Sequence, residues 1–199
     1  MAKRRPRGGR RSAALLGALV TTGVTVLVAG CAPPGGERTA TPAPTAPAPR
    51  KLALPETVLG LPRSERPELV QLSRSPLDRL RAEVTDPTST VDGAYAGRAR
   101  SADGVVVSGV SGTVTDPAGA LARVLSPYPV KTFRTVEYGR FGGEVRCGRG
   151  RTEDKGYLTV CGWADPQTAG VVAFVSPRKQ LELNTEFYAI RDTLDGTVG

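Results

Sequence analysis

The sequence contains no histidine among its 199 residues. This absence excludes every catalytic triad, dyad or proton shuttle that needs an imidazole, and it removes the commonest zinc ligand. The glycines do not form a Gly-Lys-Ser/Thr phosphate loop, and no metal-ligand spacing occurs. We therefore expect no metal, no cofactor and no catalytic residue, which favours a non-enzymatic protein.

Anionic residues are absent from the N-terminal segment. Residues 1–30 contain six lysines and arginines and no aspartate or glutamate, whereas the remainder carries 21 cations and 19 anions. The formal charge of +8 therefore belongs largely to the N-terminal segment, and the rest of the chain is close to neutral at +2. Composition thus gives no support to a nucleic-acid partner, and we expect none.

A long hydrophobic run occurs at one place. Residues 13–30 are uncharged and largely apolar, follow a cationic segment at residues 1–12, and end in two small residues before Cys31. This is the three-part pattern of a secretory signal peptide. We assign residues 1–30 to a signal peptide that is cleaved before Cys31.

This segment ends in Leu27 followed by VAGC, whose last residue is Cys31. The ending resembles the lipobox of bacterial lipoproteins. The resemblance implies acylation of the Cys31 thiol, and two or more acyl chains attach a protein stably to membrane lipid. The alternative is an uncleaved single-pass anchor, although 18 residues span only ~27 Å as a helix. Both interpretations place the rest of the chain at the outer face of the cytoplasmic membrane, because the cations stay inside.

Residues 31–52 are predicted to be an extracytoplasmic linker. Residues 32–50 contain six prolines and no large apolar side chain. Such a segment cannot bury enough apolar surface to offset the entropy of ordering it. The remainder, residues 53–199, is predicted to form a single domain.

The predicted domain is α+β, with a mainly antiparallel sheet, about three helices on one face and one disulfide. Ser-Pro and Asp-Pro pairs predict the helix starts, and an apolar stripe from Leu183 to Leu194 marks the last helix. Six β-like runs are bounded by glycine. The expected helix starts are Ser75-Pro76, Asp116-Pro117 and Ser176-Pro177, and the expected strands are residues 91–97, 105–110, 132–138, 143–147, 157–164 and 171–175.

The two remaining cysteines flank a predicted hairpin. Alternation in residues 157–165 places Cys161 and Trp163 on one face of a strand and Val160 on the other. Cys147 ends the preceding expected strand, and a polar loop separates the two. We predict a disulfide between Cys147 and Cys161, which would stabilise the fold by about 3 kcal/mol and persist outside the cytoplasm. A redox pair is the alternative, but the spacing differs from Cys-x-x-Cys.

This region also carries a family resemblance. The sequence VCGWADPQTAGVVAF at residues 160–174, with Cys147-Gly148 upstream, resembles a pattern in uncharacterised membrane-anchored or lipoprotein-like proteins of actinobacteria. The resemblance covers most of residues 53–195. It implies a location and a shared fold, and no activity.

Two groups of residues are candidates for chemistry. Ser176 and Lys179 match S-x-x-K, which resembles the acylation motif of penicillin-binding proteins, but its companion motifs are absent and we interpret Ser176 as a helix cap. Arg146, Arg149 and Arg151 are candidates for binding an anion such as a wall polymer, a phosphate or a lipid headgroup. The whole predicted hairpin region has a local charge of only +2, which favours a solvated hairpin over an anion site. Its five cations are Arg140, Arg146, Arg149, Arg151 and Lys155, and its three carboxylates are Glu144, Glu153 and Asp154.

Together these observations predict an extracytoplasmic lipoprotein anchored in membrane lipid. We expect its domain to be a non-enzymatic binding or interaction module of the cell envelope, with a protein or cell-wall partner. Two alternatives stay open. One is a small histidine-free envelope hydrolase, and the other is an accessory subunit of a membrane complex.

Overall fold

The computed structural model describes residues 49–98, 103–137, 139–180 and 182–195. These residues all lie within one compact unit, Ala46–Gly199. The predicted signal peptide, Cys31 and most of the predicted linker lie outside the described residues. Cleavage and lipidation at Cys31 therefore stay predictions.

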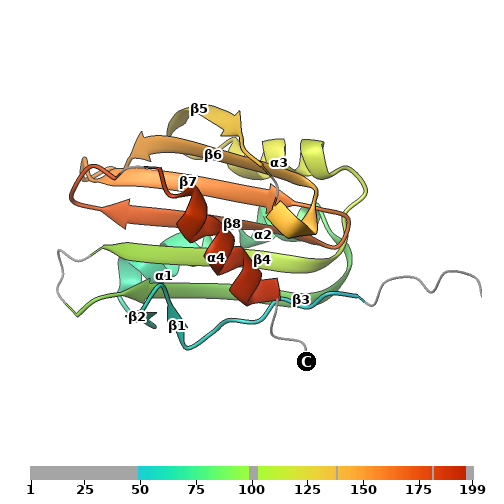
Figure 1. Cartoon of the computed structure of the whole chain (residues 1–199), viewed down its shortest axis with the longest axis horizontal. Coiled ribbons are helices and arrows are strands. Elements are labelled where there is room, and N and C mark those ends of the chain that lie inside the picture. The colour runs from blue at the N-terminus through green and yellow to red at the C-terminus, as the bar shows by residue number, and fades with distance from the viewer. Residues whose placement is uncertain (1–48, 99–102, 138, 181, 196–199) are drawn as a thin grey trace, which may run out of the picture. The chain divides into compact units, whose positions relative to one another are not determined.

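The described residues form one large antiparallel sheet and one small one. The large sheet has six strands in the order β3-β4-β8-β7-β6-β5, and every neighbouring pair is antiparallel (Figure 1). This confirms the α+β class with a mainly antiparallel sheet. The strands are β1 Thr57–Val58, β2 Leu61–Pro62, β3 Thr85–Ala96, β4 Gly104–Thr113, β5 Val130–Thr135, β6 Glu144–Arg151, β7 Tyr157–Ala164 and β8 Thr168–Ser176.

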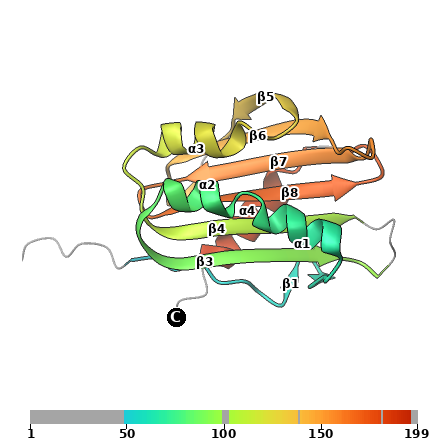
Figure 2. The same ribbon diagram turned by 180° about the vertical axis from the view of Figure 1, so that it is seen from behind.

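Helices cover both faces of the large sheet, so the expectation of helices on one face is wrong. Three helices lie on one face and α4 lies on the other (Figures 1 and 2). The reason is that β4, β7 and β8 are buried almost along their whole length, and a strand buried on both faces needs cover on both. The helices are α1 Pro67–Arg74, α2 Leu77–Ala82, α3 Pro117–Leu125 and α4 Asn184–Asp195, with a 3-10 turn η1 at Gly139–Phe141.

The predicted helix starts have three different outcomes. Asp116 caps α3 as expected, because its side chain accepts a hydrogen bond from the Gly119 amide. Pro76 immediately precedes α2, but α1 was not predicted. The start at Ser176 is wrong, because Ser176 is the last residue of β8 and α4 begins only at Asn184.

Two apolar cores lie on opposite faces of the sheet. One packs the sheet against α1, α2 and α3, and the other packs it against α4 and the segment before β1. Val160 belongs to the first core, whereas Cys161 and Trp163 belong to the second, as the alternation predicts. The Trp163 ring is fully buried, with its centroid 6.1 Å from that of Phe187 in α4.

The predicted disulfide is confirmed. Cys147 and Cys161 lie directly opposite each other on β6 and β7, with their Cα atoms 4.1 Å apart, and their sulfurs are bonded. Strand β6 continues beyond Cys147 to Arg151, where the sequence had predicted a loop. This extension decides where the arginines of the hairpin lie.

Candidate functional site

The candidate site begins where α4 leaves the sheet uncovered. In Figure 1, α4 crosses the front of the sheet from β7 toward β3 and leaves β5 and β6 open on that side. Arg149 and Arg151 lie on this face, because they alternate with Cys147 along β6. Their partners across the β6–β7 ladder, Thr159 and Tyr157, share the same face.

Two hollows lie on this open part of the sheet. A narrow hollow of about 240 Å³ lies between β5, β6 and the segment that leads into α4. A wide hollow of about 610 Å³ continues toward the end of β6 and the segment that follows β8. Both are lined by Lys131, Arg149 and Thr159, so they form one groove. We call it the basic groove, and its charged residues are Lys131, Arg134, Arg149, Arg151, Lys179 and Glu182.

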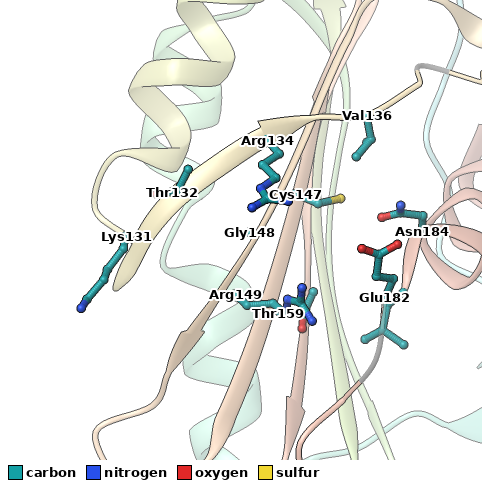
Figure 3. A pocket seen from close by; sticks show the side chains of 11 residues that line it. Lys131, Thr132, Arg134, Val136, Cys147, Gly148, Arg149, Thr159, Glu182 and Asn184 are labelled. Atoms are coloured by element: carbon teal, nitrogen blue, oxygen red, sulfur yellow. The ribbon is translucent and has the colours of Figure 1, made fainter.

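The charge of the basic groove is strongly unbalanced, with five cations and one carboxylate. Among the ion pairs of the described residues, none involves any of these five cations. Figure 3 shows Arg134 and Arg149 extending from the strands on one side, with Glu182 and Asn184 on the other. A hollow lined by one sign of charge concentrates its electric field and attracts the opposite charge.

Arg151 is held in place at the wide end of the groove. Its guanidinium carbon lies 3.8 Å from the centroid of the Tyr157 ring, and its Nη1 donates a 2.7 Å hydrogen bond to the Lys155 carbonyl. A guanidinium stacked on an aromatic ring keeps its charge while losing part of its freedom. Arg151 therefore offers a partly preorganised cation to a ligand.

Of the three arginines proposed from sequence, the structure brings two together. Arg146 lies opposite Gly162 in the ladder and so points to the other face of the sheet from Arg149 and Arg151. Its guanidinium lies 3.7 Å from the Glu144 carboxylate. The sequence analysis singled out Lys179 only as part of S-x-x-K and did not place Lys131, Arg134 or Lys179 beside these arginines. The reason is that β5 and the segment after β8 meet β6 only in the fold.

The disulfide forms part of the floor of the groove. Cys147 is half-buried and lines the narrow hollow, whereas Cys161 is fully buried beneath it. The bond holds β6 and β7 in register directly beside Arg149. It therefore fixes the relative position of β6, which carries Arg149 and Arg151, and of β7, which carries Thr159 and Tyr157.

The S-x-x-K candidate does not form a nucleophile and base at a helix start. Ser176 is buried at the end of β8, and its Oγ accepts a 3.1 Å hydrogen bond from the Arg178 amide. Within the described residues, no hydrogen bond joins Ser176 to Lys179, which is exposed and lines the wide hollow. Lys179 therefore acts as a cation of the groove.

A second polar assembly is buried at the turn between β7 and β8. Asp165 is fully buried, and its carboxylate accepts hydrogen bonds from Arg50, Arg191 and Thr168, with Nη2 of Arg191 2.9 Å from Oδ2. Asp195 lies 3.9 Å from Nε of Arg191. We call Arg50, Asp165, Arg191 and Asp195 the buried ion cluster.

The buried ion cluster has a structural role. Burial lowers the pKa of Arg191 despite two neighbouring carboxylates, and burial raises the pKa of Asp195 despite two neighbouring arginines. The cluster joins Arg50, near the start of the described residues, to α4 and to the β7–β8 turn. Asp165 also stabilises the β7–β8 turn, because its Oδ1 accepts hydrogen bonds from the amides of Gln167 and Thr168.

The described residues provide neither a metal-binding cluster nor a membrane-spanning helix. They contain no group of three or more cysteine, aspartate or glutamate side chains placed to hold a metal ion. None of their helices is long and apolar enough to cross a membrane. The predicted N-terminal anchor lies outside the described residues.

Comparisons with known proteins do not assign this chain to a family. No protein-family model, curated protein or solved structure matches it. The resemblance of residues 160–174 to actinobacterial membrane-anchored proteins therefore stays a prediction.

Proposed function

We propose that this chain is a membrane-anchored, non-enzymatic module of the cell envelope that binds an anionic ligand in the basic groove. The observation that carries the proposal is the charge of the groove, where five cations and one carboxylate line a continuous hollow. The chain after residue 30 has a net charge of only +2, so this local excess is a property of one surface. A bound anion reduces the repulsion among the cations, and this reduction favours binding.

The anchor in this proposal is the acylated Cys31, joined to the domain by the proline-rich linker. An extended linker of 19 residues, 32–50, reaches up to ~60 Å. Its last residue, Arg50, bonds to Asp165 and Asp195 in the buried ion cluster. The tether would therefore pull on a point of the domain that is firmly held and separate from the residues of the groove.

The anion-binding half of the proposal can be tested on the full chain purified in a non-ionic detergent. Calorimetric titrations would use three anionic probes: pyrophosphate, long-chain polyphosphate and poly-glutamate. We expect at least one to bind, and Arg149→Gln to weaken that binding about tenfold. Arg98→Gln is the matched control, because Arg98 is exposed and follows β3, at the opposite edge of the sheet from β5. Absence of binding to every probe, or equal losses in both variants, would refute this half.

The anchoring half is tested in cells. We expect metabolic labelling with a fatty acid to mark the wild-type chain and not Cys31→Ser. The variant should also keep its signal peptide and migrate as a larger species. An unlabelled wild-type chain, or an unchanged membrane fraction and size in Cys31→Ser, would refute lipidation at this residue.

A further inference from the structure

This inference rests on the proposed anion-binding function and concerns the chemical class of the ligand. The cations of the basic groove are spread along it and do not converge on one point. We propose that the groove binds a linear polymer of phosphate groups, with successive phosphates at three cationic positions along β6.

The register of the strands gives the order of these positions. Arg134 lies opposite Cys147 and lines only the narrow hollow. Arg149 and Lys131 line both hollows and form the middle position. Arg151, together with Lys179, lines only the wide hollow. From residue 147 to residue 151 an extended strand covers about 13 Å, which is longer than a single phosphate group, so the three positions are spread along the length of a chain.

The middle position has the donors that a phosphate group needs. Arg149 lies directly opposite Thr159 on the same face, and Figure 3 shows the two side chains close together. A phosphate group within a chain has two charged, non-bridging oxygens. The guanidinium can donate a hydrogen bond to each of them, and the hydroxyl can donate to a second lone pair on one of the same oxygens.

The surroundings of the groove argue against two other anions. Among the described residues, Leu59 is the only exposed large hydrophobic side chain, and it lies in the β1–β2 turn and not beside β5 or β6. The groove therefore has no adjoining apolar surface that would enter a bilayer next to a lipid headgroup. Tyr157 is the only aromatic residue lining the two hollows, and Arg151 covers its ring, so no free platform is available for stacking nucleic-acid bases.

The test compares chain lengths on the full protein in non-ionic detergent. We expect long-chain polyphosphate to bind at least about tenfold more tightly, per phosphate, than pyrophosphate, because the second and third contacts become intramolecular. The logarithm of the binding constant should fall with the logarithm of salt concentration with a slope of about −2, on the order of −0.7 for each of three phosphates. Poly-glutamate, a single-stranded oligonucleotide and a water-soluble anionic lipid headgroup should each bind more weakly.

Variants along the groove provide the sharper test. Arg149→Gln should weaken both pyrophosphate and the long chain, because it removes the middle position. Arg134→Gln and Lys179→Gln should each weaken the long chain and leave pyrophosphate unchanged, and Arg98→Gln should change neither. Circular dichroism and the urea midpoint would confirm that each variant folds.

The outcomes separate this inference from the proposed function. If pyrophosphate binds as tightly per phosphate as the long chain, or if the end variants weaken both equally, the inference is wrong and a compact anion site remains. If poly-glutamate, the oligonucleotide or the lipid headgroup binds as tightly as polyphosphate, the phosphate-polymer class is wrong. If no anionic probe binds, the proposed function itself fails.

Discussion

Asp165→Asn removes one charge from the buried ion cluster with almost no change in side-chain volume. The wild-type carboxylate is fully buried, and its Oδ2 lies 2.9 Å from Nη2 of Arg191 and 2.8 Å from Oγ1 of Thr168. Its Oδ1 accepts hydrogen bonds from Arg50 and from two backbone amides. An asparagine retains one acceptor oxygen and places its NH₂ group against donors.

The expected loss of stability follows from the charges that remain. Removing one partner of a buried ion pair costs about 3–5 kcal/mol, because the other charge stays buried without compensation. Asp195, 3.9 Å from Nε of Arg191, would compensate in part, so we expect a loss near the lower limit, about 3 kcal/mol. For a domain of this size, that loss lowers the melting temperature by roughly 6–12 °C.

The assay is urea denaturation of the full chain, followed by the fluorescence of Trp163, the only tryptophan. Asp192→Asn is the matched control, since Asp192 lies on α4 like Arg191 and Asp195 of the cluster but forms an exposed pair with Arg140 at 3.2 Å. The control should change the free energy of unfolding by less than about 1 kcal/mol. If Asp165→Asn were no more destabilising than Asp192→Asn, the stabilising role of the buried ion cluster would be refuted.

Three further predictions concern stability. Because burial raises the pKa of Asp195, the folded state holds that proton more tightly than the unfolded chain and loses stability as the carboxylate ionises. The stability of Asp195→Asn relative to wild type should therefore increase from about pH 4 to neutrality in urea titrations, and a constant difference would contradict this. Replacing both Cys147 and Cys161 with serine should lower the free energy of unfolding by about 3 kcal/mol, and added reductant should destabilise only the wild type. Gly170→Ala should cost about 1–3 kcal/mol, measured by urea denaturation, because its new methyl group would overlap both the buried Trp163 ring and the backbone oxygen of Ser108, and an unchanged midpoint would contradict this close packing.

Local patterns predicted much of the domain. The strand at residues 157–164 has the predicted bounds, and the disulfide and the cap at Asp116 were also predicted correctly. Each depends on residues near one another in sequence or on a single strand alternation. The errors arose where one local signal has two outcomes. At Ser176, the Ser-Pro pair that can begin a helix instead turns the chain after β8, where the hydroxyl accepts from Arg178.

Local sequence patterns could not predict on which face of the sheet each helix lies. A strand such as β8 is apolar at nearly every position, and this pattern indicates burial on both sides without showing what provides the cover. Strand β6 was also predicted too short, because its polar Gly-Arg repeats lack the apolar alternation of a core strand. Pairing with β5 and β7 extends it to Arg151.

The amino-acid sequence by itself determined the class of the fold, the strand alternation around Trp163 and the pairing of Cys147 with Cys161, because these follow from periodicity and from a short loop. Tertiary structure alone decided the basic groove, since Lys131, Arg149 and Lys179 come from three segments that meet only when β5 and the segment after β8 flank β6. It also decided the buried ion cluster, in which Arg50 and Asp165 are 115 residues apart. Charged residues this far apart in sequence leave no local pattern, because they come into contact only after the strands of the sheet have paired.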